Sequence, residues 1–219
     1  MRLIGLAGKA RSGKDTVAGM IQELVPGTRT LAFAEPMKRF LKEIFDWDER
    51  HVTGELKEVE DRRYPRGDFG HGLLHLTPRR AMQLLGTEFG RDAYPHVWVE
   101  YAMRRVKQLL AVPGDEEGTD TGGAPESRTA NDPHARLVVI TDCRFINEAK
   151  AIREAGGVVW KIDRPGAGAA GGIAKHASEE EMDSLEFWKL VSLGLKNDQG
   201  LTELRILVAA ALSLKIKEN

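Results

Sequence analysis

The residues best suited to chemistry lie near the start of the chain, where positions 8–16 read Gly-Lys-Ala-Arg-Ser-Gly-Lys-Asp-Thr. An apolar run at 3–7 precedes them, and a helical pattern of apolar residues follows from Val17 to Leu24. In this strand–loop–helix setting, Gly-x-x-x-x-Gly-Lys lets backbone N–H groups turn inward around an anion, and the helix N-terminus adds partial positive charge. Lys14 would then reach the β- and γ-phosphates of a nucleotide. The pattern predicts a nucleoside triphosphate site rather than a glycine-rich turn that only joins a strand to a helix.

Asp15 stands where such loops usually carry the Ser or Thr that offers its hydroxyl to Mg²⁺, and Thr16 follows one position later. A carboxylate is a hard oxygen ligand, so Asp15 could hold Mg²⁺ directly or through water. It could instead stabilise the helix, because an acidic side chain is favourable in the first helical turn. We expect the metal role and keep the helix role as the alternative.

The composition is that of one globular domain, because 219 residues that are 42% hydrophobic can build a full core. A net charge of −1 gives no general attraction to nucleic acid or to a membrane surface. The single cysteine, Cys143, excludes an internal disulfide and a cysteine-based zinc site, which suits a reducing cytoplasm. No signal peptide precedes the first expected strand, and the apolar run at 206–212 is too short to span a bilayer. We therefore expect a cytoplasmic protein.

Strand-like and helical segments alternate along the chain. Strands are expected at 3–7, 28–33, 137–141, 158–162 and 188–195, and helices at 17–24, 35–45, 77–91, 95–110, 145–155 and 201–215. Alternation of this kind indicates an α/β domain with a parallel sheet of about five strands and helices on both faces. The segment 46–75 is highly charged and rich in glycine, and we expect it to be irregular, with one helical turn near Lys57.

Four polar stretches directly follow expected strands. They are residues 8–16 (the phosphate loop), Asp142 to Arg144, the segment 164–178, and Asn197-Asp198. Ligands of such sheets bind at the carboxyl ends of the strands. We therefore expect the four stretches to meet at one edge of the sheet.

A second set of polar residues shares one side of the helix that should begin at Thr77-Pro78, with Thr as N-cap and Pro at the first helical position. At helical spacing, the apolar side consists of Ala81, Leu84, Leu85 and Phe89, and the opposite side of Arg80, Gln83, Thr87 and Arg91. Two guanidinium groups flanking an amide and a hydroxyl suit a ligand with a phosphate and a base edge. On spacing alone, a solvated helix face is the alternative.

Residues 113–134 differ from the rest of the chain. They contain three prolines, four glycines and six acidic residues against one arginine. So little apolar surface cannot offset the entropy of ordering, and we expect a disordered, inert surface insertion. The glycine-rich segment 164–178 is expected to be a lid-like loop.

Taken together, these motifs resemble the bacteriophage deoxynucleoside monophosphate kinases, distant relatives of the animal phosphomevalonate kinases within the P-loop nucleoside-monophosphate-kinase fold. The matching pieces, in the family's order, are residues 8–16, 31–38, 82–91, Trp98, 141–148, 156–165, 176–179 and 197–200. They cover most of the chain except the insertion. Gln199 interrupts the Asn-Asp-Gly turn that is usual in the family.

The resemblance implies ATP-dependent phosphorylation of deoxynucleoside 5′-monophosphates to diphosphates, with Mg²⁺, in a single kinase domain spanning 1–219. Residues 35–112 would form its acceptor-binding helical part. The implied catalytic residues are Lys14, Arg11, Arg144 and Asp142, with Asp15 and Asp142 as metal ligands. The implied donor-binding residues are Gly8, Ala10, Ser12, Gly13, Lys14, Asp15, Thr16, Asn197 and Asp198. The implied acceptor-binding residues are Lys38, Lys57, Arg80, Gln83, Thr87, Arg91, Trp98, Glu148 and His176.

Several of these residues have a structural alternative. Asp142 could cap the following helix, Arg144 could pair with Glu148, and Trp98 could belong to the core. Lys57 could lie on a solvated face. His71 and His75 are four residues apart but lack a third ligand, so we expect no metal there.

Other functions also remain open. A kinase of the same fold could act on phosphomevalonate, dephospho-coenzyme A or another phosphorylated metabolite. A nucleotide switch or ATPase would require a guanine-specifying Asn-Lys-x-Asp or an acidic pair after the third strand. The order Lys196-Asn197-Asp198 does not supply the first, and Cys143 after Asp142 does not supply the second. A small-molecule acceptor is the only partner expected, and a homodimer stays open.

Overall fold

The computed structural model describes residues 2–66, 74–111, 137–168 and 177–216. The chain divides into two compact units, one formed by 1–32 with 102–219 and the other by 33–101. We describe each unit separately, the first as the sheet unit and the second as the helical unit. The expected insertion at 113–134, most of the expected lid-like loop, His71 and His176 lie outside the described residues.

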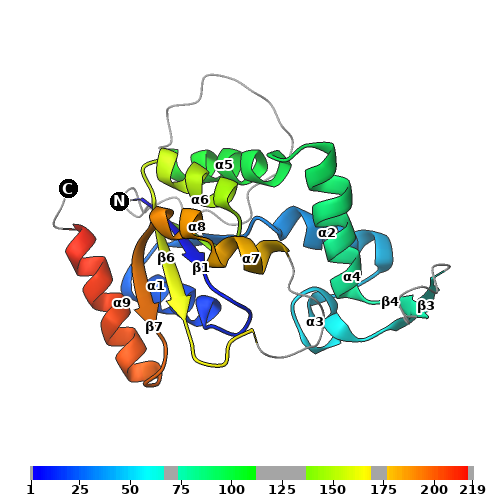
Figure 1. Cartoon of the computed structure of the whole chain (residues 1–219), viewed down its shortest axis with the longest axis horizontal. Helices are drawn as coiled ribbons and strands as arrows, with labels where there is room; N and C mark the ends of the chain where they lie inside the picture. Colours follow the sequence, from blue (N-terminus) through cyan, green and yellow to red (C-terminus); the bar gives the residue numbers. More distant parts are fainter. Residues whose placement is uncertain (1, 67–73, 112–136, 169–176, 217–219) are drawn as a thin grey trace. The chain divides into compact units, whose positions relative to one another are not determined.

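The sheet unit contains five parallel strands in the order β2-β5-β1-β6-β7. Three of them, β1, β6 and β7, are labelled in Figure 1. The strands are β1 (Leu3–Ala7), β2 (Arg29–Leu31), β5 (Val138–Cys143), β6 (Val158–Asp163) and β7 (Val191–Lys196). Its helices are α1 (Lys14–Leu24), α6 (Ile146–Glu154), α7 (Ala177–Asp183), α8 (Leu185–Leu190) and α9 (Leu201–Ile216). The expected fold class, an α/β domain with a parallel sheet of about five strands and helices on both faces, is confirmed.

Helices cover both faces of this sheet because side chains alternate along each strand. Ile4 and Leu6 of β1 and Trp160 of β6 pack with residues of α1 and α9 in one buried cluster. On the opposite face, a Cβ added to Gly5 would lie 2.4 Å from Ile152 of α6. The sheet is thus a buried middle layer, and its strand ends are left to carry the loops.

The last strand begins later than expected. Residues 185–190 form α8, because Ser184 caps that helix by accepting a 3.1 Å hydrogen bond from the backbone N–H of Phe187. The strand prediction for 188–195 was therefore wrong at Trp188 to Leu190 and right for the rest.

The helical unit is built around a small cluster of Leu41, Trp47 and Ala81 with partly buried neighbours. Its elements are α2 (Glu35–Phe45), α3 (Glu49–Val52), the 3₁₀ turn η1 (Glu55–Glu58), the hairpin β3 (Asp61–Pro65) with β4 (His75–Leu76), α4 (Pro78–Gln83) and the π-helix η3 (Leu84–Arg91). The helix α5 (Val97–Leu110) begins in this unit and ends in the sheet unit.

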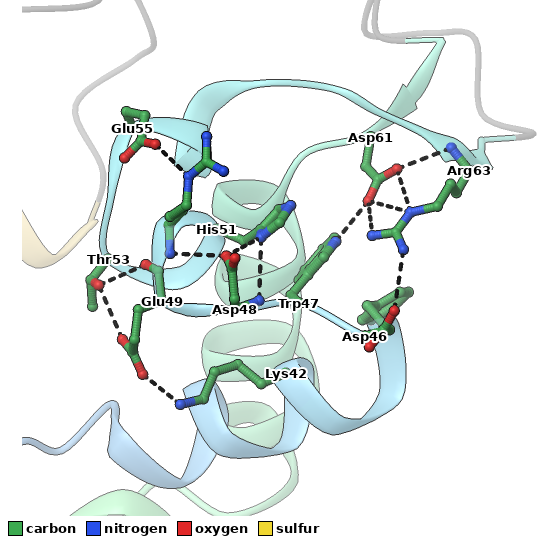
Figure 2. Close-up of polar contacts among 12 residues, drawn as sticks. Lys42, Asp46, Trp47, Asp48, Glu49, His51, Thr53, Glu55, Asp61 and Arg63 are labelled. Carbon is green, nitrogen blue, oxygen red and sulfur yellow. Dashed lines mark hydrogen bonds and ion pairs between the residues drawn. The ribbon is translucent and has the colours of Figure 1, made fainter.

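The segment after α2, expected to be irregular, is ordered by the polar contacts in Figure 2. The indole Nε1 of Trp47 donates to Asp61 Oδ2 at 2.8 Å, and Asp61 also accepts from the guanidinium of Arg63. Asp48 accepts from the backbone N–H of Arg50 and forms a capping box with His51. These contacts give α3 and the hairpin fixed positions within a highly charged sequence.

Candidate functional site

The phosphate loop lies between β1 and α1 and closes around the side chain of Lys14. The Lys14 ammonium donates hydrogen bonds to the carbonyl oxygens of Gly8 at 2.8 Å and Lys9 at 2.9 Å. The backbone N–H of Ser12 donates to the carbonyl of Lys9 at 3.2 Å. The loop is therefore a compact ring with a cation held by its own carbonyl groups, and phosphate oxygens could replace those carbonyl groups as partners.

Both glycines of the motif are required by the backbone and by their neighbours. Gly8 has φ 147° and Gly13 has φ 102°, values that side-chain-bearing residues rarely adopt. A Cβ at Gly8 would lie 2.6 Å from the carbonyl oxygen of Ile162, and one at Gly13 would lie 2.5 Å from Nδ2 of Asn197. Any larger residue would therefore displace the loop from the strands that support it.

Segments that follow two other strands, β6 and β7, meet at this loop. Asn197, just after β7, donates from Nδ2 to the carbonyl of Ser12 at 2.8 Å, and its backbone N–H donates to the carbonyl of Asp163 at 2.7 Å. The backbone N–H of Gly168 donates to the carbonyl of Ala10 at 3.1 Å. The expected meeting of polar stretches at one sheet edge is confirmed for these residues.

The electrostatic environment of Lys14 brings Asp142 and Arg144 into the same site. Burial, with help from the charge of Arg144, lowers the pKa of Lys14 to about 8, although Asp15 and Asp142 oppose this shift. Lys14 is only 8% exposed. Lys14 is therefore a buried cation whose charge is influenced by two carboxylates and an arginine. A bound anion would stabilise the charged form of Lys14 further, as expected at a phosphate site.

The loop has further features that suit a polyphosphate. The hydroxyl of Ser12 is fully buried and has no hydrogen-bond partner among the described residues. Arg11 is exposed and has φ 64°, an uncommon conformation for a non-glycine residue. Backbone strain of this kind is concentrated at functional sites.

The expected Mg²⁺ ligands have suitable chemistry. Asp15 and Thr16 are exposed in the first turn of α1, and Asp142 is half-buried near the end of β5. Carboxylate and hydroxyl oxygens are the ligands that Mg²⁺ prefers, and it usually keeps several waters besides one or two carboxylates. In the described ranges, no group of three or more His, Cys, Asp or Glu side chains could hold a metal by itself. The oxygens of Asp15, Thr16 and Asp142 fit, by their chemistry, an ion that shares its coordination with a bound phosphate.

Next to the loop, the sheet unit has a polar pocket of about 280 Å³. Its lining residues are Thr16, Arg164, Pro165, Asn197, Asp198, Gly200 and Leu201. Asn197 and Asp198 were expected at a donor site, whereas Arg164, Pro165, Gly200 and Leu201 were missed. Their position could have indicated them, because Arg164 directly follows β6 and Leu201 begins α9. The pocket and the phosphate loop share Thr16.

In the helical unit, the polar stripe departs from its expected geometry. Thr77 caps α4 by accepting from the backbone N–H of Arg80, as expected, but the helix changes to η3 at Leu84. A π-helix has more residues per turn than an α-helix, so Thr87 and Arg91 no longer follow Arg80 and Gln83 at α-helical spacing. The prediction of one continuous α-helix with a buried Phe89 was wrong, since Phe89 is 70% exposed.

The π-helix is stabilised by close packing that no spacing rule reveals. Trp98 donates from Nε1 to the carbonyl of Gly86 at 2.9 Å, and a Cβ at Gly90 would lie 2.5 Å from the Trp98 ring. A Cβ at Gly86 would lie 2.9 Å from the sulfur of Met37. These contacts account for Trp98 as a packing residue, which was the alternative to its expected substrate contact.

The remaining expected acceptor residues have different surroundings. Lys38 is half-buried on α2, Lys57 is half-buried on η1, and an ion pair of Arg80 with Glu88 joins α4 to η3 at 3.6 Å. Glu148 is 2% exposed, and its carboxylate accepts from the backbone N–H groups of Arg144 at 2.7 Å and Phe145 at 3.1 Å. Glu148 therefore caps α6, and we do not retain it as a substrate contact.

Comparison with known proteins agrees with the motifs. The sequence profile described as deoxynucleotide monophosphate kinase matches residues 2–67. A protein of Acanthamoeba polyphaga mimivirus, provisionally named deoxynucleotide monophosphate kinase, is 33% identical over 201 residues, which cover 90% of each chain.

Two solved structures also align over nearly their full length. Shikimate kinase from Acinetobacter baumannii has a TM-score of 0.48 at 12% identity, over 100% of this chain and 95% of its own. Dephospho-CoA kinase from Campylobacter jejuni has a TM-score of 0.44 at 12% identity, over 98% of this chain and 97% of its own. Likenesses this remote do not bear on the activity. The viral relative does bear on the activity, because its similarity extends over 90% of both chains. It confirms the resemblance seen in the motifs: the chain belongs to the deoxynucleotide monophosphate kinase family and is a nucleotide kinase, a phosphotransferase.

Proposed function

We propose that this enzyme transfers the γ-phosphoryl group of ATP to a deoxynucleoside 5′-monophosphate, giving ADP and the deoxynucleoside diphosphate. The observation that carries the donor assignment is the phosphate loop, in which the buried Lys14 ammonium donates hydrogen bonds to the carbonyl oxygens of Gly8 and Lys9. A triphosphate would offer that cation anionic oxygens instead, and the attraction between opposite charges is stronger in a buried site than in water.

The pocket next to the loop suits the nucleoside part of the donor. The aliphatic side chain of Leu201 and the ring of Pro165 offer apolar contact for a base, and the guanidinium of Arg164 offers a flat surface for stacking. Asn197 and Asp198 supply polar groups beside it. Thr16 lies at the boundary between the proposed base and phosphate positions.

The proposed chemistry needs no general base. The attacking group is an oxygen of the acceptor phosphate, which is mostly ionised near pH 7 because its second pKa is about 6. As its bond to the γ-phosphorus forms, the bond from that phosphorus to the bridging oxygen of ADP breaks. Lys14, Arg11 and Arg144 would stabilise negative charge on the transferring group. Mg²⁺ held by Asp15 and Asp142 would neutralise charge on the β- and γ-phosphates.

We assign the acceptor to the helical unit, through Arg80 and Arg91 for its phosphate and Gln83 and Thr87 for its base or sugar. The π-helix supports this assignment because such distortions are frequently found at functional sites. Lys38 and Lys57 remain proposed contacts. The assignment of His176 also remains a prediction.

A homodimer is a separate proposal. The helix α9 is rich in apolar residues, and Leu201, Ile206 and Leu207 are exposed on it. Helices of this composition usually bury their outer face against a partner, and we propose a second copy.

No helix in the described part of the chain is long and apolar enough to cross a membrane. A cytoplasmic location stays a prediction.

The deciding experiment measures ADP release with each deoxynucleoside and ribonucleoside monophosphate, and identifies the product by chromatography. Labelled phosphate from [γ-³²P]ATP should appear in a deoxynucleoside diphosphate. Lys14→Met serves as the inactive control. Label in phosphomevalonate or dephospho-coenzyme A but in no nucleotide would overturn the acceptor assignment and leave the donor assignment intact.

A further inference from the structure

Besides Lys14, a second lysine is buried in the sheet unit. Lys161 lies in the middle of β6 and is 7% exposed, on the face of the sheet opposite to Trp160. Its ammonium donates to the carbonyl of Met182 at 2.8 Å and lies 4.0 Å above the ring centre of Trp188. Burying a charge costs free energy unless the charge is paired. The residue that pairs with Lys161 therefore decides how its charge is tolerated.

That residue is Asp183, the last residue of α7. Its Oδ1 lies 3.6 Å from the Lys161 ammonium, and its Oδ2 lies 2.9 Å from the ammonium of Lys9. Burial alone would raise the pKa of Asp183, but its hydrogen bond with Lys9 and the charges of both lysines outweigh burial and lower it. One ionised carboxylate thus joins a lysine of the sheet to a lysine of the phosphate loop.

Lys9 in turn controls the geometry around Lys14. The carbonyl oxygen of Lys9 accepts hydrogen bonds from the Lys14 ammonium and from the backbone N–H of Ser12. The methylene groups of Lys9 pack against Gly168, where an added Cβ would lie 3.1 Å from Lys9 Cδ. A displacement of Lys9 would therefore move a carbonyl that determines where the Lys14 ammonium lies.

We propose that Asp183, oriented by Lys161, is a positioning residue for donor binding, because it fixes Lys9 and so pre-organises the phosphate loop. The inference rests on the proposed donor site. A loop that is already ordered loses less entropy when it binds a triphosphate. The Lys9–Asp183 pair is partly exposed, with side-chain exposures of 37% and 42%, so its effect should be moderate.

The test is a double-mutant cycle read out as direct binding of ATP without acceptor. Asp183→Asn and Lys9→Met should each raise the Kd for ATP about two- to fivefold, while the KM of the acceptor stays within twofold. The double variant should be no worse than either single one, because both remove the same contact. Lys161→Met should weaken ATP binding in the wild-type background and have no further effect in Asp183→Asn.

The ion pair of Lys150 with Glu186 provides a matched control, because it joins α6 to α8 at 2.8 Å and does not involve the phosphate loop. Lys150→Met and Glu186→Gln should leave the Kd unchanged. Lys9→Met keeps the carboxylate beside Lys161, so it still tests the inference if Asp183→Asn unfolds.

Three results would overturn the inference. They are additive effects of Asp183→Asn and Lys9→Met on the Kd for ATP, an equal rise of the Kd for ATP and of the acceptor KM, and an unchanged Kd for ATP in Lys9→Met. If the wild-type protein binds ATP and the cycle is non-additive but no deoxynucleotide is phosphorylated, the inference stands and the proposed acceptor is wrong. A wild-type protein that does not bind ATP would overturn both.

Discussion

The side-chain amide of Asn197 donates a 2.8 Å hydrogen bond to the carbonyl oxygen of Ser12, and thereby joins the end of β7 to the phosphate loop 185 positions earlier. The same Nδ2 occupies the space that a Cβ at Gly13 would need. The loop therefore takes its conformation from the opposite end of the sequence as well as from its own glycines.

Removal of this hydrogen bond should weaken donor binding. Asn197→Ala should raise the KM for ATP about threefold to tenfold, the range expected when a partly buried hydrogen bond is lost. Asn197→Asp should be worse, because a carboxylate oxygen would face the carbonyl oxygen of Ser12. Steady-state kinetics at varied ATP concentration measures both, with the exposed neighbour Gln199→Ala as control. Equal KM values in all three variants would contradict a supporting role for Asn197.

The lowered pKa of Lys14 makes donor binding sensitive to pH. With a pKa of about 8, Lys14 is mostly charged at pH 7 and mostly neutral at pH 9 in the free enzyme. We expect kcat/KM for ATP to fall as the pH rises through 8, well below the range in which an ordinary lysine loses its proton.

Lys14→Arg provides the control for this pH dependence. An arginine keeps its charge across the range, so the fall near pH 8 should disappear, although the activity itself should be lower. A pH profile identical to that of the wild type in Lys14→Arg would assign the pH dependence to another group.

The two carboxylates proposed for Mg²⁺ can be separated by titration of the metal. Asp142→Asn should raise the Mg²⁺ concentration that gives half-maximal activity, because an amide is a weaker ligand for a hard cation than a carboxylate. Asp15→Asn should behave in the same way if Asp15 holds the ion, and should change only stability if it serves the helix N-terminus. A Mg²⁺ dependence that neither substitution alters would exclude both residues as ligands.

The acceptor residues predict a different pattern. Arg91→Ala should raise the KM of the acceptor about tenfold to a hundredfold, the loss expected when a charge-assisted contact is removed, and should leave the KM for ATP nearly unchanged. Gln83→Leu should change the ranking of thymidine, deoxyguanosine and deoxyadenosine monophosphates without removing charge. Arg50→Ala, an exposed arginine of the same unit that pairs with Glu55, is the control. If Arg91→Ala impaired only the use of ATP, these residues would not bind the acceptor and would be solvated surface residues.

The packing around the π-helix predicts a loss of stability. Gly90→Ala would place a methyl group 2.5 Å from the ring of Trp98, which has little room to move, and should cost about 1–3 kcal/mol. Gly19→Ala on α1 meets no atom within 4 Å and should stabilise the protein by about 0.5–1 kcal/mol. Thermal unfolding of both variants gives the comparison. A melting temperature of Gly90→Ala at or above that of the wild type would contradict the described contact.

Local patterns predicted the sheet unit well, because its strands are short apolar runs and its phosphate loop has a specific spacing. The same reasoning failed where distant contacts determine the structure. The α-helical spacing of Arg80 to Arg91 does not reveal a π-helix that depends on Trp98 and on two glycines. Likewise, the charged segment after Phe45 contains a capping box at Asp48 and His51 that could have been recognised, but the contact of Trp47 with Asp61 could not.

The role of Glu148 shows a related limit. A carboxylate four residues after an arginine suggests a side-chain pair, yet it is the backbone N–H of Arg144 that Glu148 binds. Sequence spacing identifies which residues can lie close together on a helix. It does not show that the buried carboxylate of Glu148 binds the backbone of Arg144 rather than its guanidinium.

The position of β1 in the centre of the sheet has a consequence for biosynthesis. Both neighbours of β1 come late in the chain, since β5 begins at Val138 and β6 at Val158. At translation rates of about 5–20 residues per second, the apolar strand Leu3–Ala7 leaves the ribosome on the order of ten seconds before its first partner exists. Residues 33–101, which have their own hydrophobic cluster, are all synthesised before β5. The nascent chain thus carries an unpaired, aggregation-prone strand, and its yield in a cell should depend on chaperones that shield that strand until β5 and β6 have been made.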